Sequence, residues 1–317
     1  MTSRVSVEVP SELDRVRIDR VLALLADVSR SVSRQMLEAG TVSIAGVPAT
    51  MATVPHTGDL VEYQLPEEEA PLQPEAIPFE VAYESADVIV VNKPAGLVVH
   101  PGAGNTSGTL ASGLIHRYPE LQQLGTENRW GLVHRLDRDT SGLLLVARSS
   151  QMHSYLQAEL TARTIGRTYL ALTSGRLHAA TGTIDAPIGR DPLRPTRMAL
   201  VQDGRPARTH YRRLAEWEEC ALVEVQLETG RTHQIRVHFA AIGNGLVGDA
   251  AYGRGLLVPG NPGRVWLHAM KLRFTLPDGE VHEIESDLPA DLVRSLQALG
   301  EPAIGDAAAQ RATDHHD

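Results

Sequence analysis

The sequence predicts an α+β protein whose main domain contains a mixed, mainly antiparallel sheet. The apolar runs at 88–91 and 143–147 are typical of strands that are buried on both faces. Val223, Val225 and Leu227 alternate with polar residues, as expected of a strand with one buried face. Strands outnumber helices, and the helices do not alternate regularly with them. This order favours an α+β fold over a doubly wound parallel sheet.

The composition limits the classes of protein to which the chain can belong. Its 317 residues are enough for two domains, and it has no run of about 18 apolar residues that would predict a transmembrane helix or charged start that would predict a signal peptide. Cys220 is the single cysteine, so no internal disulfide can form. The net charge of −9 argues against nonspecific coating of nucleic acid but allows a local basic groove. We expect a soluble, cytoplasmic protein without a membrane partner, and we expect a monomer.

Residues 1–66 are predicted to form a small module of two helices followed by strands. The first helix is expected near 17–25, where apolar residues recur every three or four positions. The second helix is expected to begin after Ser31 as its N-cap and to end at Gly40. Short strands are expected at 41–44 and 60–65.

This module resembles the S4 RNA-binding domain. The resemblance rests on the Arg17-Ile18-Asp19 start of the first helix, on the serine and arginine pattern at 29–34, and on the segment that follows the second helix. It implies that Arg30 and Arg34 contact RNA phosphates. The alternative is a solvated helix face that binds nothing, because residues 1–66 hold more acidic than arginine residues.

The remaining boundaries follow from changes in composition. Residues 67–78 are rich in acid and proline and are expected to form a semi-extended linker. Residues 79–298 are expected to form the main domain, with a helix near 152–160 and strands near 168–172 and 270–276. The tail at 299–317 has no periodic pattern and is expected to be disordered.

The segment at 131–142 places four charged residues immediately before the apolar run at 143–147. Charged side chains at the end of a buried strand are often functional, although a polar turn with a satisfied arginine–aspartate pair is the ordinary alternative. From composition alone, neither interpretation is favoured.

The order of several motifs over residues 79–297 resembles that in the RluA-type family of RNA pseudouridine synthases. The residues within these motifs are most similar to those of the RluD-like branch. A single Arg-Leu-Asp motif would carry little weight, whereas six motifs in the expected order are specific. The six motifs are Val91–Pro101, His134–Gly142, Arg167–Tyr169, Gly230–His238, Gly248–Gly253 and Leu267–His268.

The resemblance implies a reaction that needs no cofactor and depends on one carboxylate, that of Asp137. This carboxylate attacks the sugar or the base, or removes the C2′ proton, and the sequence does not decide among these routes. The resemblance places Arg236 beside Asp137, where two-pronged hydrogen bonding would keep the carboxylate charged. It implies that Tyr169 stacks on the uracil and accepts the C5 proton. The alternative is that Tyr169 only packs in the core.

Two further residues are expected to bind the substrate. A uridine in folded RNA must leave its stack to enter a pocket. The resemblance implies that the guanidinium of Arg135 moves into the vacated space and that Leu267 lines the pocket floor. Core packing is an equally good account of Leu267.

For several other polar residues we considered a function and favour another role or leave the choice open. Asp139 lies two residues after Asp137, but a loop role with side-chain bonding to the backbone is favoured over a paired-carboxylate glycosidase. His134, His233 and His238 lack the spacing of a metal site, so hydrogen bonding within the fold is favoured. Five arginines are expected on a mobile loop that either grips RNA phosphates or is merely solvated. They are Arg190, Arg194, Arg197, Arg205 and Arg208.

Together these patterns predict an RNA pseudouridine synthase that acts on structured RNA. The expected partner is 23S ribosomal RNA or a precursor of the large ribosomal subunit. One alternative is an RNA-binding or ribosome-assembly protein that keeps the fold without catalysis. Another is a glycoside or nucleoside hydrolase that uses Asp137 and Asp139.

Overall fold

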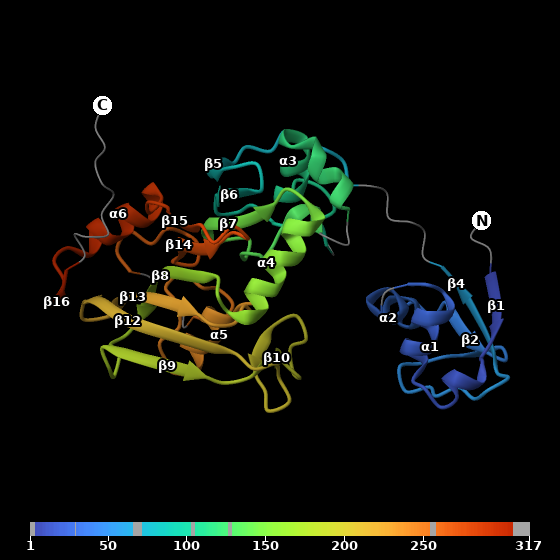
Figure 1. The fold of residues 1–317 in the computed structure, drawn as a ribbon. Helices are drawn as coiled ribbons and strands as arrows, with labels where there is room; N and C mark the ends of the chain where they lie inside the picture. Colours follow the sequence, from blue (N-terminus) through green and yellow to red (C-terminus); the bar gives the residue numbers. More distant parts are fainter. Residues whose placement is uncertain are drawn as a thin grey trace. The chain divides into compact units, whose positions relative to one another are not determined.

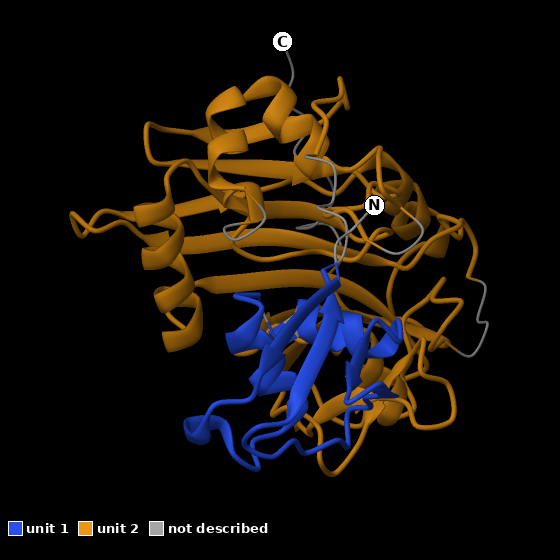
Figure 2. Ribbon diagram, turned by 90° about the vertical axis from the view of Figure 1, so that its right-hand side faces the viewer, with its two compact units in different colours: residues 1–71 blue, residues 72–317 orange. Residues whose placement is uncertain are grey.

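A computed structural model describes residues 4–28, 30–65, 72–102, 105–125, 129–253 and 258–306. The chain forms two compact units, residues 1–71 and 72–317 (Figure 2). Within the described ranges, no helix has both the length and the apolar character needed to cross a membrane. The two units are described separately.

Unit 1 contains two helices and a four-stranded antiparallel sheet in the order β1-β4-β2-β3 (Figure 1). The expected helices and strands are present, whereas β1, in which Val5 and Val7 alternate with polar residues, was not predicted. The elements are β1 (Arg4–Glu8), η1 (Ser11–Leu13), α1 (Ile18–Leu25), α2 (Arg30–Glu38), β2 (Val42–Ile44), β3 (Val47–Pro48) and β4 (Leu60–Gln64).

The ends of α2 only partly follow the prediction. The helix begins at Arg30, so Ser31 lies inside its first turn and the predicted N-cap is wrong. Gly40 ends the helix as expected, with a φ of 70° in the left-handed region. The amide of Thr41 donates to the carbonyl of Met36 at 3.1 Å, and the amide of Gly40 donates to that of Leu37 at 3.1 Å.

Unit 2 is built on a sheet with the strand order β16-β12-β13-β8-β14-β7-β6-β5, while β15 pairs with β14 and β9 pairs with β12 (Figure 1). The β7–β14 pairing is parallel and the other pairings in this sheet are antiparallel. The α+β prediction is therefore confirmed. The strands are β5 (Glu80–Glu84), β6 (Val88–Lys93), β7 (Ser141–Ala147), β8 (Gly166–Ser174), β9 (Thr181–Asp185), β12 (Arg208–Glu216), β13 (Cys220–Leu227), β14 (Leu267–Thr275), β15 (Val281–Glu285) and β16 (Ile304–Gly305).

Strand β7 is the buried centre of this unit, as the apolar run at 143–147 predicted. All seven of its residues are buried. Leu144 and Val146 contribute to the core on one face of the sheet, where α3 packs, whereas Leu143 and Leu145 contribute to the core on the other face, where α4 packs. The helices and 3-10 turns are α3 (Leu110–Arg117), η2 (Pro119–Leu124), η3 (Arg129–Gly131), α4 (Ser150–Ala162), α5 (Gln234–Ala241) and α6 (Ala290–Leu299).

The burial of β13 differs from the prediction. Leu222 and Val223 are both fully buried, so β13 is covered on both faces rather than on one. It lies between β12 and β8, and Leu222 packs in the core under α6. In α5, Ile235 and Phe239 are buried, whereas Ile242 follows the helix and is 38% exposed.

Three segments that were expected to be irregular are more ordered than predicted. The arginine-rich loop contains the hairpin of β10 (Ile188–Arg190) and β11 (Met198–Leu200). Leu72 packs against the core of unit 2, so only part of the predicted linker at 67–78 is separate from that unit; residues 66–71 lie outside the described ranges. The predicted disordered tail begins too early, because β16 pairs with β12 and the Trp217 indole donates to the carbonyl of Gly300 at 3.0 Å. Residues 307–317 of that tail also lie outside the described ranges.

Candidate active site

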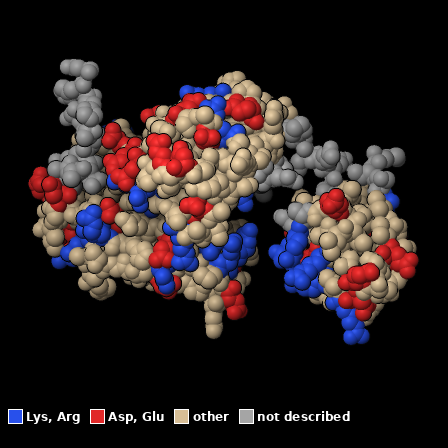
Figure 3. Space-filling view, viewed as in Figure 1, with Lys and Arg blue, Asp and Glu red and all other residues tan. Residues whose placement is uncertain are grey.

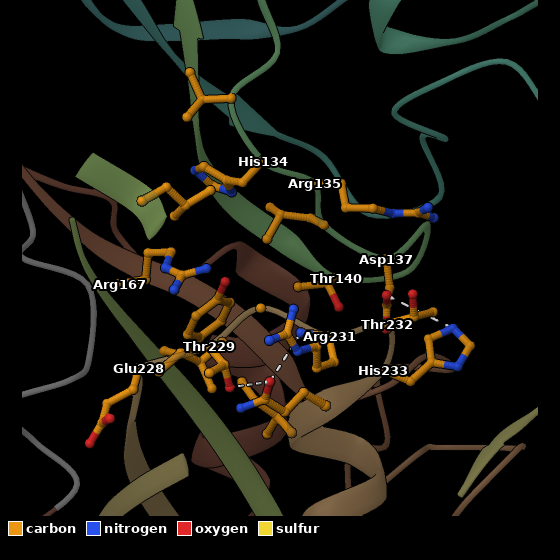
Figure 4. A pocket seen from close by; sticks show the side chains of 18 of the residues that line it. His134, Arg135, Asp137, Thr140, Arg167, Glu228, Thr229, Arg231, Thr232 and His233 are labelled. Carbon is orange, nitrogen blue, oxygen red and sulfur yellow. Dashed lines mark hydrogen bonds and ion pairs between the residues drawn. The ribbon is translucent and has the colours of Figure 1, made fainter. Parts of the chain in front are cut away.

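A cavity of about 510 Å³ in unit 2 brings together five of the seven predicted site residues (Figure 4). Arg135 and Asp137 lie on the loop before β7, Tyr169 on β8, Arg236 in the first turn of α5, and Leu267 at the start of β14. Strand pairing places these elements side by side, because β8 and β7 both pair with β14.

The loop before β7 is held through its backbone by two cations. The carbonyl of Arg138 accepts hydrogen bonds from Lys93 Nζ at 2.9 Å and from the Gly96 amide at 2.8 Å. The carbonyl of Asp139 accepts one from Arg264 Nη1 at 3.1 Å. Lys93 is fully buried, and burial lowers the pKa of its ammonium to about 7. These bonds fix the chain on the C-terminal side of Asp137.

Arg236 joins two carboxylates. Its Nη1 donates to Asp137 Oδ2 at 3.0 Å, whereas Nε and Nη2 donate to the two oxygens of Asp249 at 2.7 and 2.8 Å. The two-pronged contact that we predicted for Asp137 therefore belongs to Asp249, and Asp137 receives a single bond. Burial alone would lower the pKa of Arg236, but the hydrogen bonds and charges of Asp249 and Asp137 raise it overall.

Asp249 is a site residue to which sequence analysis gave no role. Its side chain is fully buried, and its Oδ1 also accepts hydrogen bonds from the amides of Ala251 and Tyr252 at 2.9 and 3.1 Å. Burial would raise the pKa of this carboxyl, but its hydrogen bond with Arg236 lowers it overall. Its position inside the Gly248–Gly253 motif was the available signal.

His233 lies beside Asp137 and is hydrogen bonded within the fold, as predicted. Its Nδ1 is 2.7 Å from the hydroxyl of Tyr252, and its Nε2 is 3.9 Å from Asp137 Oδ1. Burial is the largest cause that lowers the pKa of His233. The Tyr252 ring also lies 5.0 Å from the guanidinium carbon of Arg236. The site thus surrounds Asp137 with one cation and one imidazole.

Tyr169, Leu267 and Arg135 occupy different depths of the pocket. The Tyr169 and Leu267 side chains are buried, and burial raises the pKa of the Tyr169 phenol. The Arg135 side chain is exposed and points away from His134 in Figure 4. The apolar Leu267 and the aromatic Tyr169 therefore line the buried part of the pocket that contains Asp137, and the exposed cation of Arg135 lines its outer part.

Comparison with known proteins agrees with this arrangement. Residues 87–241 match the family described as RNA pseudouridylate synthase. "Ribosomal large subunit pseudouridine synthase D" of Nitrosomonas europaea is 43% identical over 305 residues, which cover 93% of this chain and 88% of that protein. The chain belongs to the RNA pseudouridine synthase family. It is accordingly an isomerase that acts on RNA.

Two further members support this assignment of the synthase. "Uncharacterized RNA pseudouridine synthase" of Chloroflexus aurantiacus is 46% identical over 310 residues, 94% of each chain. The solved structure of "Human RNA Pseudouridylate Synthase Domain Containing 1" has a TM-score of 0.57 and 27% identity, and the match covers 77% of this chain and 98% of that one. Both sequence and fold therefore place the chain in the family.

The remaining polar residues that were singled out have structural partners in the synthase. The Asp139 carboxylate accepts hydrogen bonds from Arg138 at 3.0 and 3.3 Å. The predicted bond to the backbone is not found within the described part of the chain. His238 lies 2.9 Å from Thr209 Oγ1 and 3.1 Å from the carbonyl of Ala186, while His134 Nε2 accepts from the amide of Leu145 at 3.3 Å. Among the residues that the structure describes, no group of three side chains could hold a metal ion.

The pocket wall of the synthase is richer in arginine than the motifs indicated. Arg205, from the predicted RNA-gripping segment, lines it together with Arg163, Arg167 and Arg231. Arg197 instead donates to the carbonyl of Ala251 at 2.7 Å. Figure 3 shows Lys and Arg side chains gathered in patches on each unit despite the net charge of −9. The arginines that line the pocket therefore make this part of the protein locally basic.

Arg30 and Arg34 lie in unit 1, outside this pocket. Arg30 Nη2 donates to Asp19 Oδ2 at 3.1 Å, and Arg34 Nε lies 4.0 Å from the same oxygen. Asp19 is fully buried, whereas both arginine side chains are 54% exposed. The buried carboxylate therefore orients two cations toward solvent.

Proposed function

We propose that this synthase isomerises uridine in the RNA of the large ribosomal subunit and that Asp137 is its catalytic residue. The proposal rests above all on one observation: the carboxylate of Asp137 lies in the pocket, bonded to an arginine that a second carboxylate holds in place. The names of the relatives from Nitrosomonas europaea and Xanthomonas campestris support the large-subunit substrate.

Arg236 holds the carboxylate of Asp137 in position through an ion pair of 3.0 Å. Nε and Nη2 of Arg236 bind Asp249, so the remaining nitrogen, Nη1, points at Asp137 Oδ2. The other oxygen of Asp137, Oδ1, receives no bond from Arg236. That oxygen is then available to react with the sugar or the base of the bound nucleotide, or to remove the C2′ proton.

Tyr169 and Leu267 hold the uracil in this scheme. The phenol ring stacks on the base, and the apolar side chain of Leu267 packs under it. Burial raises the pKa of Tyr169, so the phenol stays protonated at neutral pH. If its oxygen takes the C5 proton in the last step, the phenolic proton must leave at the same time, directly or through water.

Tritium release tests the reaction itself. Large-subunit RNA transcribed with 5-tritiated uridine should lose tritium to water and gain pseudouridine when it is incubated with the wild-type protein. Binding of this RNA without tritium release would favour the inactive RNA-binding protein instead. Free uracil with an abasic site would favour a hydrolase, which the bonding of Asp139 to Arg138 already disfavours.

The Asp137→Asn variant tests the residue. We expect turnover to be abolished, while the dissociation constant for unmodified RNA changes by less than about threefold, because the carboxylate supplies chemistry rather than affinity. Asp139→Asn is the matched control, and it should retain most of the turnover. Equal loss of binding and turnover in Asp137→Asn would contradict the assignment.

A further inference from the structure

Arg167 is a buried cation in the pocket that no carboxylate balances. It lies two residues before Tyr169 on β8, so both side chains leave the strand on the same face, and both line the pocket. Figure 4 shows the position of Arg167 in the pocket. Only 6% of Arg167 is exposed. No hydrogen bond or ion pair joins its guanidinium to another residue that the structure describes, and its Nε is buried without a partner.

Three other buried cations of unit 2 have hydrogen-bond or ion-pair partners within the fold. Lys93 donates to three backbone carbonyls, Arg236 binds two aspartates, and Arg264 binds Asp291 and the loop backbone. Burial lowers the pKa of Arg167, and only the phenol of Tyr169 offsets this. An uncompensated buried charge destabilises a fold, so a cation kept in this state needs another explanation.

The surroundings of Arg167 indicate a ligand that forms hydrogen bonds. A Cβ atom on Gly230 would lie 2.7 Å from Arg167 Nη1, so the backbone of the pocket wall confines the guanidinium closely. His134 Nδ1 and Thr140 Oγ1 line the same pocket and are also buried without a partner. Three buried polar groups thus face one cavity without partners among the described residues.

The depth of each arginine in the pocket indicates which part of an RNA can reach it. Arg205 is exposed, Arg231 is half-buried, and the Arg163 side chain is 50% exposed. A phosphodiester carries a sugar on each side, so it fits beside these outer arginines. A single base turned out of its stack can pass deeper, where Arg167 and Tyr169 lie.

We propose that Arg167 binds the uracil and stabilises the negative charge that the base carries while it is detached from the sugar. This inference rests on the proposed function. When the N1–C1′ bond breaks, its electron pair stays with the base, which becomes an anion delocalised over N1, O2 and O4. A fixed cation in a buried site stabilises such developing charge far more than it would in water.

The charge balance holds for either attack on the sugar or proton removal. If Asp137 attacks C1′, its negative charge is lost in the new ester bond and the base leaves with that charge. If Asp137 removes the C2′ proton, it becomes a neutral acid and the base again leaves as the anion. In each case one negative charge moves from a carboxylate paired with Arg236 to a base beside Arg167. The C5–C1′ bond then forms, Asp137 regains its charge, and the C5 proton leaves as N1 takes one up.

A change of leaving group tests this role. Fluorine at C5 withdraws electrons and stabilises the detached base, so its departure depends less on an external cation. In single-turnover reactions, Arg167→Met should slow cleavage of the N1–C1′ bond by about 100-fold or more for uridine. The loss should be at least about tenfold smaller for 5-fluorouridine in the same RNA. Nuclease digestion and chromatography of the N-linked nucleoside measure both rates.

Control variants separate this role from others. Arg167→Lys keeps the charge and should show a smaller loss and a fluorine effect close to that of wild type. Arg205→Gln removes an outer arginine and should weaken RNA binding without changing the fluorine effect. The midpoint temperature of unfolding of Arg167→Met should equal or exceed that of wild type, because an unbalanced buried charge has been removed.

Several outcomes would overturn the inference. A lower unfolding midpoint with equal rate losses for both nucleosides would mean that Arg167 only supports the fold. Weaker RNA binding with an unchanged cleavage rate would mean that it contacts a phosphate. Failure of the proposed function is distinguished by the wild-type protein, which would then form no pseudouridine before any variant is compared.

Discussion

At the scale of single residues, the site is a chain of ionic contacts from Asp249 through Arg236 to Asp137. Asp249 is the fully buried end of this chain and satisfies two arginine donors and two backbone amides. The carboxylate of Asp137, the proposed catalytic residue, is the more exposed end, at 17%. The buried end therefore sets the geometry and the exposed end remains open to substrate.

Replacing Asp249 should affect both activity and stability. In Asp249→Asn, Arg236 loses one of its two charged partners, and we expect kcat to fall by about 10- to 100-fold because the guanidinium is no longer held in its orientation toward Asp137. Breaking a buried ion pair on one side should also cost about 3–5 kcal/mol of unfolding free energy. Urea unfolding and single-turnover kinetics measure the two effects. Asp139→Asn, in an exposed pair, should cost less than about 1 kcal/mol; similar costs for both variants would refute this account.

Lys93 should make activity depend on pH. Its ammonium donates to three carbonyls, including that of Arg138 in the loop before β7. Its pKa is lowered to about 7, so the amine loses a proton, and one donor, as the pH rises through about 7. We expect kcat to decrease over that range with little change in KM.

The Lys93→Met variant is the check on this pH dependence. It should have a low kcat and should lack the decrease near neutral pH, while RNA binding is retained. A wild-type profile that stays flat through this range would show that Lys93 keeps its proton or that the loop does not depend on it.

At the scale of elements, the loop before β7 depends on the close approach of β7 to β14. Gly142 has a φ of 112°, and a Cβ atom there would lie 2.2 Å from the carbonyl oxygen of Ala269. A side chain at this position would push apart the parallel strand pair that carries Asp137 on one side and Leu267 on the other.

Gly142→Ala should therefore destabilise the protein by more than about 3 kcal/mol, the sum of backbone strain and steric overlap. Gly279→Ala is a matched control, because Gly279 also has a positive φ, 89°, but has open space where the Cβ would lie. The control should cost only about 1–2 kcal/mol. Equal losses in denaturant unfolding would show that strain alone matters at Gly142.

Elements with a strong local pattern could be predicted, and contacts between distant segments could not. The run at 143–147 predicted a strand buried on both faces, and all of β7 is buried. Asp137, Tyr169 and Arg236 were found through motifs. The pairing of Arg236 with Asp249 and the lack of a partner for Arg167 depend on which segments meet in space, and local sequence does not contain that information. The β10–β11 hairpin was missed because its two strands are only three residues long and Pro192 and Pro195 lie in the turn between them.

At the scale of the whole molecule, unit 1 is proposed to be an S4-like RNA-binding module. Asp19 holds Arg30 and Arg34 at its surface, where both remain half exposed. Phosphate contacts of this kind add affinity without sequence specificity and respond to salt.

Removing both arginines should weaken binding and reduce its salt dependence. For Arg30→Gln with Arg34→Gln, the slope of log K against log salt should become shallower by about 1 to 2 units, since each phosphate contact contributes about 0.7–0.9. The single-turnover rate at saturating RNA should change little. Arg294→Gln, an exposed residue of α6 outside the pocket, is the control. An unchanged slope would exclude the two arginines as phosphate contacts.

The pairing of β16 with β12 has a consequence for the solubility of the protein. Without this segment, part of β12 would present free amide and carbonyl groups along an open sheet edge, and such edges can recruit strands from other molecules. Ile304 and Gly305 pair with Glu216 and Ala215, and the tight fit leaves no room for a side chain on Gly305. We therefore expect residues 304 and 305 to limit self-association, and we expect a chain ending at Leu299 to aggregate more readily during expression and storage.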